Sequence, residues 1–121
     1  MLVIDDSELS LELAAAALEN ADFEARTLSS VADFDATVGD WMPDVILTDV
    51  RMPGISGVEL CRFLKSRYET AHVPVVLFSA SPAAELAVLA RDCDADGYLS
   101  KVAGFDKLGE EISRLIESVL F

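Results

Sequence analysis

Five residues with acidic, hydroxyl or amino side chains stand at points where short apolar runs of the chain end. They are Asp5, Asp6, Asp49, Ser79 and Lys101. Taken singly, an aspartate at such a point is typical of a turn or a helix cap, and a lone lysine is usually solvated. Taken together, three carboxylates, a hydroxyl and an ammonium group form the set that phosphoryl transfer to a protein carboxylate requires.

The predicted chemistry centres on Asp49, which closes the apolar run of residues 45–48. Three carboxylates at one edge repel each other and need a cation, and Mg²⁺ is the hard, oxygen-seeking candidate. Beside such a metal, Asp49 could attack phosphorus and form an acyl phosphate. Lys101 could neutralise one phosphoryl oxygen and Ser79 could donate a hydrogen bond to a second. Backbone N–H groups after Asp49 could hold the third oxygen.

Alternating strand and helix patterns explain how residues far apart in the chain could meet. The expected strands cover residues 2–4, 23–28, 44–48, 73–78 and 97–100. The expected helices cover residues 7–21, 29–40 (stopped at Gly39), 57–68, 82–93 and 105–121. Right-handed crossovers between successive strands predict a parallel α/β sheet with helices on both faces. The five polar residues then gather beyond the carboxyl ends of the strands, where ligands bind in such sheets.

Helical spacing also predicts which side of each helix faces the core. In the first helix, capped by Asp6 or Ser7, the residues that recur at this spacing are Leu9, Leu13, Ala16, Ala17 and Asn20. The residues expected to point inward from the third helix are Val58, Leu60, Cys61, Leu64 and Tyr68. The apolar stripe of the last helix consists of Phe105, Leu108, Ile112, Leu115, Ile116 and Val119. Pro82 is expected in the first turn of the fourth helix.

The overall composition limits the class of protein. A chain of 121 residues, 52% of them hydrophobic, has the size of one compact domain, so we expect residues 1–121 to form a single domain. No apolar run is long enough to span a bilayer and no signal segment precedes the first strand, which predicts a cytoplasmic protein without a membrane partner. The formal charge of −13 argues against direct binding to nucleic acid.

The two cysteines, Cys61 and Cys93, fall within two different expected helices. Neither has a second Cys or a His at the spacing of metal ligands, so a metal site is not indicated. We therefore expect small buried hydrophobic side chains rather than a disulfide framework.

Four segments resemble the receiver domain of two-component response regulators, and the resemblance extends over essentially all 121 residues. They are IDDS at residues 4–7, LTDVRMPGISGVEL at 47–60, FSA at 78–80 and GYLSK at 97–101. The most specific match is the pattern D-x-x-M-P-x-x-x-G from Asp49 to Gly57. The resemblance implies a flavodoxin-like (βα)5 fold with strand order 2-1-3-4-5. It also implies phosphorylation of Asp49 by a sensor histidine kinase or a histidine phosphotransfer protein.

The resemblance also implies a role for each site residue. It makes Asp49 the phosphoacceptor, Asp6 a direct Mg²⁺ ligand and Asp5 a residue that acts mainly through metal-bound water. The backbone carbonyl of Arg51 would complete the protein's share of the metal coordination. Ser79 and Lys101 would bind the phosphoryl group. Tyr98 matches the aromatic residue whose rotamer reports activation, although a tyrosine in a short strand could equally serve packing alone.

Phosphorylation is expected to act as a switch. A phosphoryl group adds charge and acceptor oxygens, so it could draw Ser79 inward and let Tyr98 fill the vacated space. The surface expected to change comprises the helix at 82–93, the strand at 97–100 and the helix at 105–121. A downstream effector domain or protein, or a second copy in a homodimer, would dock on this surface. The domain is expected to signal rather than to be an enzyme, with at most self-catalysed phosphorylation and dephosphorylation.

One residue departs from the family pattern, and a second is unusual at its position. Val102 stands where the family usually has a proline after the lysine, and the Lys101–Val102 peptide is predicted to be trans, because a non-proline cis bond costs about 3 kcal/mol. Arg51 places a cation two residues from the acceptor, where it could pair with an acidic neighbour, restrict the attacking water, or point to solvent. An influence of Arg51 on phosphoryl lifetime is therefore predicted.

Two other classes of function fit these residues less well. A receiver-like module that binds partners without phosphate has no physical need for all five polar residues at the strand ends. A phosphohydrolase of the haloacid dehalogenase type needs a second Asp two residues after its nucleophile, and those positions here hold Arg51 and Ser7. Phosphoryl acceptance therefore accounts best for the residues.

Overall fold

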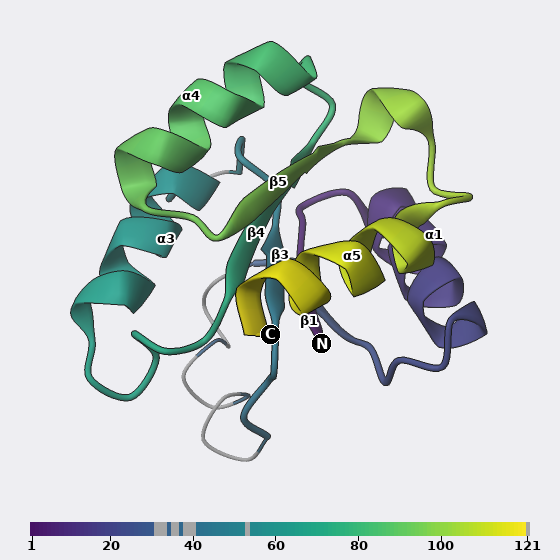
Figure 1. Ribbon diagram of the computed structural model, residues 1–121, viewed down its shortest axis with the longest axis horizontal. Helices are drawn as coiled ribbons and strands as arrows, with labels where there is room; N and C mark the ends of the chain where they lie inside the picture. The colour runs from purple at the N-terminus through teal and green to yellow at the C-terminus, as the bar shows by residue number, and fades with distance from the viewer. Residues whose placement is uncertain (31–33, 35–36, 38–40, 53, 121) are drawn as a thin grey trace.

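The computed structural model describes residues 1–30, 34, 37, 41–52 and 54–120 (Figure 1). The strands are β1 (Leu2–Ile4), β2 (Arg26–Leu28), β3 (Ile46–Thr48), β4 (Val75–Ser79) and β5 (Gly97–Ser100). They form one sheet in the order β2-β1-β3-β4-β5, and every neighbouring pair is parallel. The predicted sheet and its strand order are thus confirmed.

The helices cover the two faces of this sheet. They are α1 (Glu8–Asn20), α3 (Gly57–Ser66), α4 (Ala83–Cys93) and α5 (Leu108–Leu120), with a short 3₁₀ turn η2 (Lys101–Ala103) after β5. Helices α1 and α5 lie on one face, and α3 and α4 lie on the other (Figure 1). The helix predicted at 29–40, with its end at Gly39, lies mostly outside the described residues. No helix in the described part of the chain combines the length and apolar character needed to cross a membrane.

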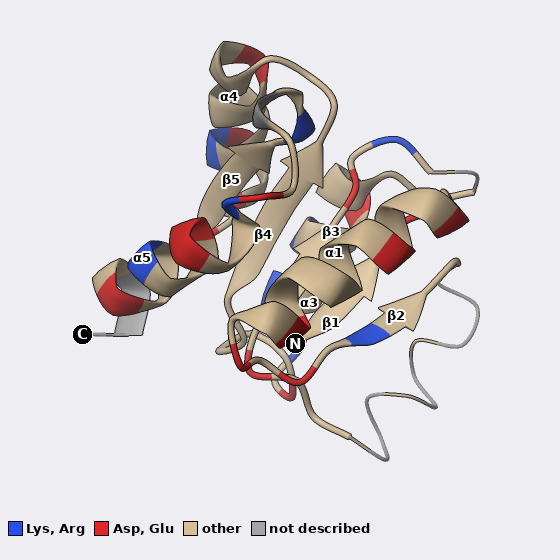
Figure 2. Ribbon diagram, turned by 90° about the vertical axis from the view of Figure 1, so that its right-hand side faces the viewer, with Lys and Arg blue, Asp and Glu red and all other residues tan. Residues whose placement is uncertain are grey.

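The alternation of side chains along each strand divides the core into two clusters. Ile4, Ile46 and Leu77 pack under α3 and α4, whereas the neighbouring Val3 and Leu47 pack under α1 and α5. Burial on both sides explains why β1, β3 and β4 are apolar at nearly every position, whereas the edge strands β2 and β5 are less buried. The charged residues lie mainly outside these clusters, and acidic ones are spread over α1 and α5 (Figure 2).

The predicted apolar face of α1 was wrong. The buried residues of this helix are Leu11, Ala14 and Leu18, while Leu9 is 64% exposed and Leu13 is 43% exposed. Leucine and alanine occur on every side of α1, so the pattern contains two apolar stripes and packing against α5 and the sheet selects one of them. Of the two candidate caps, Ser7 is the N-cap, since its hydroxyl accepts a hydrogen bond from Ser10 N at 3.3 Å.

The expected inward position of Tyr68 was also wrong, because this side chain is 94% exposed. Helix α3 ends at Ser66 and the backbone of Arg67 is extended, so helical spacing no longer applies beyond that point. The other predicted residues of this face, Val58, Leu60, Cys61 and Leu64, do pack in the core. The stripe of the last helix is confirmed for Leu108, Ile112, Leu115 and Ile116. Phe105 packs in the same cluster but precedes α5, and the side chain of Val119 lies outside the description. Pro82 is the N-cap of α4, one position before the expected one.

Candidate functional site

The carboxyl ends of β1 and β3 bring three aspartates together. Asp5, Asp6 and Asp49 each offer a carboxylate oxygen, and these oxygens lie within 4.8 Å of one another. The sheet fixes this arrangement, because the backbone N–H of Asp49 donates to the carbonyl oxygen of Ile4 at 2.9 Å. Asp5 is buried, Asp49 is half-buried and Asp6 is exposed. The cluster therefore runs from the interior to the surface, as access by a soluble ion requires.

Backbone donors orient two of these carboxylates. Oδ1 of Asp5 accepts the N–H of Ser7 at 2.9 Å, and Oδ1 of Asp49 accepts the N–H of Val50 at 2.8 Å. Three oxygen donors of like charge within this distance fit a hard divalent cation such as Mg²⁺. Arg51 lies in the same loop, two residues past Asp49, and the role of its carbonyl as a further ligand stays a prediction.

The loop that runs from Asp49, the predicted phosphoacceptor, to the start of α3 is called the acceptor loop. Gly57 explains why this loop needs glycine at the end of its sequence pattern. A Cβ atom at this position would lie 2.0 Å from the carbonyl oxygen of Asp49. The N–H of Gly57 donates to the carbonyl of Val50 at 2.8 Å, so the first turn of α3 rests directly on the acceptor loop. Ser56 caps the same helix by accepting the N–H of Glu59 at 3.1 Å. The acceptor loop is thus clamped between β3 and the start of α3.

Lys101 reaches the cluster from the end of β5. Its ammonium group forms an ion pair with Oδ2 of Asp5, and its Nζ lies 3.8 Å from Oδ2 of Asp49. It also lies 3.4 Å from the hydroxyl of Ser10 and 5.4 Å from the ring centroid of Phe78. With 12% of its side chain exposed, Lys101 is held between Asp5 and the protein interior.

A capped turn directs Lys101 in the absence of the family's proline. The described part of the chain contains no cis peptide bond, which confirms the predicted trans link to Val102. Lys101 begins η2, and Ser100 caps this turn by accepting the N–H of Val102 at 3.2 Å. The Ser100 hydroxyl in turn donates to the carbonyl of Ser81 at 2.7 Å. The turn is therefore tied to the loop after β4.

The surroundings of Asp49 raise the pKa of its carboxyl group above the ordinary value of 3.8. Burial is the largest cause, and the charge of Asp5 acts in the same direction. Lys101, the N–H of Val50 and a hydrogen bond from Ser79 oppose it, in that order. The ionised form of Asp49 is therefore destabilised in this cluster, and any added positive charge beside it favours that form.

An open pocket adjoins Asp49 on the side of β4. It is lined by Asp49, Arg51, Ser79, Ala80, Ser81, Pro82, Glu85 and Lys101. Ser79 is buried at the end of β4, and its hydroxyl oxygen accepts the N–H of Ser81 at 3.4 Å. The pocket therefore presents a carboxylate, a hydroxyl and an ammonium group to one space.

Arg51 and Tyr98 lie at the margins of this arrangement. Of the three fates considered for Arg51, pairing is observed, since its Nη2 lies 3.6 Å from Oε1 of Glu85. Tyr98 stands opposite Leu77 in the register of β4 and β5, which places it on the α3 and α4 face of the sheet. It is 39% exposed. Its role as a switch residue stays a prediction.

Sequence reasoning missed several residues that contact the site. They are Ser10, Phe78, Ser81, Glu85 and Ser100. Ser81 and Ser100 stand at or just beyond strand ends, so the rule that selected Ser79 could have found them. Ser10 lies 91 residues from Lys101 and belongs to a helix, and no local pattern indicates their contact.

Comparison with known sequences gives relatives of the same kind. The family model described as response regulator receiver domain matches residues 1–113. The phosphate regulon transcriptional regulatory protein PhoB of Pseudomonas aeruginosa is 33% identical over 101 residues, which are 84% of this chain and 44% of PhoB. The polar-differentiation response regulator DivK of Brucella ovis is 28% identical over 113 residues, which are 93% of this chain and 91% of DivK.

Solved structures support the same fold. The chemotaxis response regulator CheY4 of Vibrio cholerae is similar to this chain with a TM-score of 0.83 at 23% identity, covering 94% of this chain and 95% of CheY4. The first relatives found by sequence are longer proteins, of which this chain spans 44% and 50%. The likeness to those relatives therefore concerns one part of their length.

Proposed function

Because the chain belongs to the family of response regulator receiver domains, we propose that residues 1–121 act as one receiver domain that accepts a phosphoryl group on Asp49. One observation carries this proposal: the ammonium group of Lys101 lies 3.8 Å from Asp49 within a cluster of three carboxylates. Members of this family are signalling domains, and the expected cytoplasmic location is part of the proposal.

The proposed reaction moves a phosphoryl group from a histidine nitrogen to a carboxylate oxygen. Asp49 attacks phosphorus, the N–P bond of the donor breaks, and an O–P bond to Asp49 forms. Mg²⁺, held by Asp6, Asp49 and through water by Asp5, would supply positive charge for the phosphoryl oxygens. Lys101 balances a second oxygen and Ser79 donates its hydroxyl hydrogen to a third. The pocket beside Ser79 leaves room for these oxygens.

The direct test uses a small phosphoryl donor. We expect that acetyl phosphate and Mg²⁺ add one phosphoryl group to the purified chain, detected by intact mass, stable in acid and lost in base. Peptide mapping should locate this group on Asp49. Asp49→Asn should show no addition, and omission of Mg²⁺ should slow it strongly. A folded wild-type chain that gains no base-labile phosphoryl group would rule the proposal out.

The donor is proposed to dock on the exposed face of α1. The first turn of α1 borders the site, since Ser10 lies 3.4 Å from Lys101, and the adjacent Leu9 is 64% exposed. Leu13 extends this apolar strip along the helix. An exposed apolar strip next to a reactive group fits a protein donor that must bring its phosphohistidine to Asp49.

Leu9→Glu should slow transfer from a phosphohistidine protein about tenfold, because truncating or charging an interface anchor costs about 1–2 kcal/mol. Phosphorylation by acetyl phosphate should be unchanged, because the reactive residues are intact. Val88→Glu is the matched control, since Val88 is an exposed apolar residue on α4. The measurement is a quenched time course of phosphotransfer. Equal transfer rates for the two variants would contradict docking on α1.

Arg51 and Glu85 are proposed to restrict water at the pocket that they help to line. An exposed ion pair contributes at most about 1 kcal/mol, so Arg51→Ala should speed loss of the phosphoryl group by about two- to fivefold. Glu85→Ala should act in the same direction, and the double variant should not exceed the larger single effect. The measurement is the decay of phosphorylated protein after removal of the donor. An unchanged decay rate in Arg51→Ala would eliminate this role.

The output is proposed to involve α4, β5 and α5. Ser79 and the loop after β4 are tied to η2 through Ser81 and Ser100, so a shift of Ser79 can reach β5 and Tyr98. An effector or a second copy would recognise the altered surface. Beryllofluoride, a phosphoryl mimic, should change partner affinity or oligomeric state at least several-fold. The same affinity and the same state with and without it would count against a switch.

A further inference from the structure

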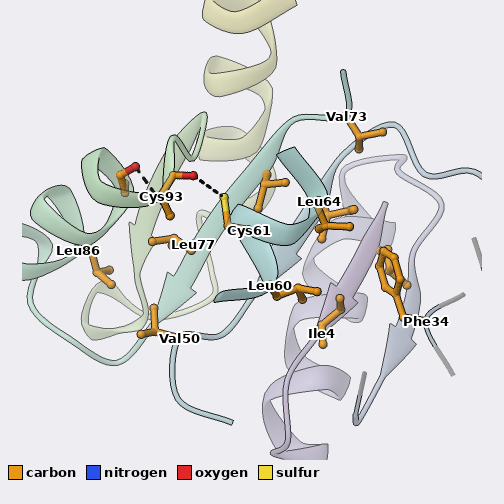
Figure 3. Close-up of a cluster of buried hydrophobic side chains, with 14 residues drawn as sticks. Ile4, Phe34, Val50, Leu60, Cys61, Leu64, Val73, Leu77, Leu86 and Cys93 are labelled. Carbon is orange, nitrogen blue, oxygen red and sulfur yellow. Dashed lines mark hydrogen bonds between the residues drawn. The ribbon is translucent and has the colours of Figure 1, made fainter. Parts of the chain in front are cut away.

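The two cysteines of the chain meet between α3 and α4. Cys61 and Cys93 are 0% and 2% exposed, and both belong to the core cluster under these helices (Figure 3). The Sγ of Cys61 lies 3.3 Å from the carbonyl oxygen of Cys93 and donates to it. The predicted burial is confirmed, and the structure adds that two cysteines 32 residues apart lie side by side, with the Cys61 thiol on the main chain of Cys93. Both are free thiols.

The surroundings protect the pair in the resting fold. Burial raises the pKa of Cys61 to about 12, and its contact with the Cys93 thiol acts in the same direction. Because the thiolate is the reactive form, a buried protonated thiol is slow to react. Cys93 is the last residue of α4, and Asp94 after it takes a left-handed backbone conformation. Helix ends open more readily than helix centres, so opening at this end would expose the pair to an oxidant.

The same position determines what a bond between the two sulfurs would do. Two polar links already join α3 to this region, the 3.5 Å contact from Arg62 to the carbonyl of Asp92 and the 2.6 Å ion pair of Lys65 with Asp96 just beyond α4. Cys61 and Cys93 pack beside Ala90, and small side chains at a helix contact allow close approach. A covalent link here would hold the end of α4 against α3.

We propose that Cys61 and Cys93 are a site of reversible disulfide formation that joins α3 to α4 under oxidation by a peroxide. The peroxide first oxidises one thiol to a sulfenic acid and is itself reduced to water. The second thiol then attacks that sulfur, and the S–S bond forms as the S–O bond breaks. The released hydroxide takes the proton of the second thiol and leaves as a second water molecule. Disulfides of this kind in reducing compartments are typically redox-sensing rather than structural.

The disulfide would give the chain a second input through α4. This consequence rests on the proposed function, because α4 is part of the surface proposed to respond to phosphorylation. The disulfide itself does not depend on phosphorylation, and it is tested without any phosphoryl donor.

The test treats the folded wild-type chain with hydrogen peroxide, removes the peroxide with catalase, and alkylates the remaining thiols with iodoacetamide in denaturant. We expect an intact monomer that has lost two hydrogens and carries no alkyl group, and peptide mapping should join Cys61 to Cys93. Dithiothreitol should restore two alkylatable thiols. Full alkylation of both cysteines after peroxide, sulfinic acids on separate cysteines, or a disulfide-linked dimer would each overturn the proposal.

Thermal unfolding adds a second measurement. The oxidised chain should unfold several degrees above the reduced chain, because the bond closes a loop of the unfolded state. Cys61→Ala and Cys93→Ala should each keep one alkylatable thiol and show no peroxide-dependent shift. The wild-type mass result stands even if one variant fails to fold. An equal peroxide-dependent shift in a folded single-cysteine variant would contradict the assignment.

Discussion

Gly57→Ala should destabilise the chain by about 3 kcal/mol and slow phosphorylation of Asp49 by acetyl phosphate by at least tenfold. A Cβ atom at Gly57 would lie 2.0 Å from the carbonyl oxygen of Asp49 and 3.0 Å from the Cα atom of Val50. Both neighbours are backbone atoms, so no side chain can rotate away and the acceptor loop itself must move. A displacement of that loop moves Asp49 relative to Lys101 and the other carboxylates, and catalytic geometry tolerates little displacement.

Gly54 offers the matched control, because it lies in the same loop and a Cβ there would meet nothing within 4 Å. Its φ of +88° is unfavourable for alanine, so Gly54→Ala should cost only about 1 kcal/mol. Urea unfolding and the rate of acetyl phosphate labelling measure both variants. If Gly57→Ala were no less stable and no slower than Gly54→Ala, the clamp between α3 and the acceptor loop would not exist.

The placement of the acidic and basic site residues followed from the sequence because it depends on strand direction. Near-continuous apolar runs ahead of Asp5, Asp49 and Ser79 indicate strands buried on both faces, and such strands are parallel. Parallel strands end at the same edge, so residues directly after them must gather there. Lys101 directly follows β5 and is placed at this edge for the same reason. The carboxylate oxygens of the three aspartates lie within 4.8 Å of one another, and Nζ of Lys101 lies 3.8 Å from Oδ2 of Asp49.

The faces of helices were harder to predict, because several apolar stripes can coexist on one helix. In α1 the residues Leu9 and Leu13 satisfy helical spacing as well as Leu11 and Leu18 do, yet only the latter two are buried. Tyr68 continues the spacing of α3 in sequence but lies past the end of the helix. Tertiary packing and helix ends decide these cases, and neither is visible in a local pattern.

Contacts between distant segments were the least accessible to sequence reasoning. The ion pair of Lys101 with Asp5 joins residues 96 apart, and the contact of Cys61 with Cys93 joins residues 32 apart. Strand order brings such residues to a common edge or layer. The choice of partner within that layer depends on side-chain reach, so Lys101 is paired with Asp5 as well as placed near Asp49.

Lys101→Met should destabilise the chain by about 3 kcal/mol at neutral pH, because it leaves the buried carboxylate of Asp5 without its ion-pair partner. The variant also loses the largest influence that lowers the pKa of Asp49, so burial and the charge of Asp5 raise that pKa further. The phosphoryl group would lose its ammonium contact as well. Labelling by acetyl phosphate should therefore fall at least tenfold.

The same change makes stability more dependent on pH. A carboxyl group whose pKa is higher in the folded state binds its proton more tightly there, so its stabilising contribution is present below the ordinary value of 3.8 and is lost as pH rises through the folded value. Removing Lys101 raises the folded-state pKa of Asp49 further, so the pH range over which this contribution is lost becomes wider. Lowering the pH from about 7 to 5 should therefore recover more stability in Lys101→Met than in the wild type.

Added Mg²⁺ separates this explanation from a simple loss of packing. A cation beside the three carboxylates replaces the missing positive charge, so Mg²⁺ should stabilise Lys101→Met more than it stabilises the wild type. Urea unfolding at two pH values, with and without Mg²⁺, measures both effects, and Lys107→Met controls for replacing an exposed lysine. A loss of stability in Lys101→Met that neither lower pH nor Mg²⁺ reduces would mean that Lys101 stabilises the site by packing and not by its charge.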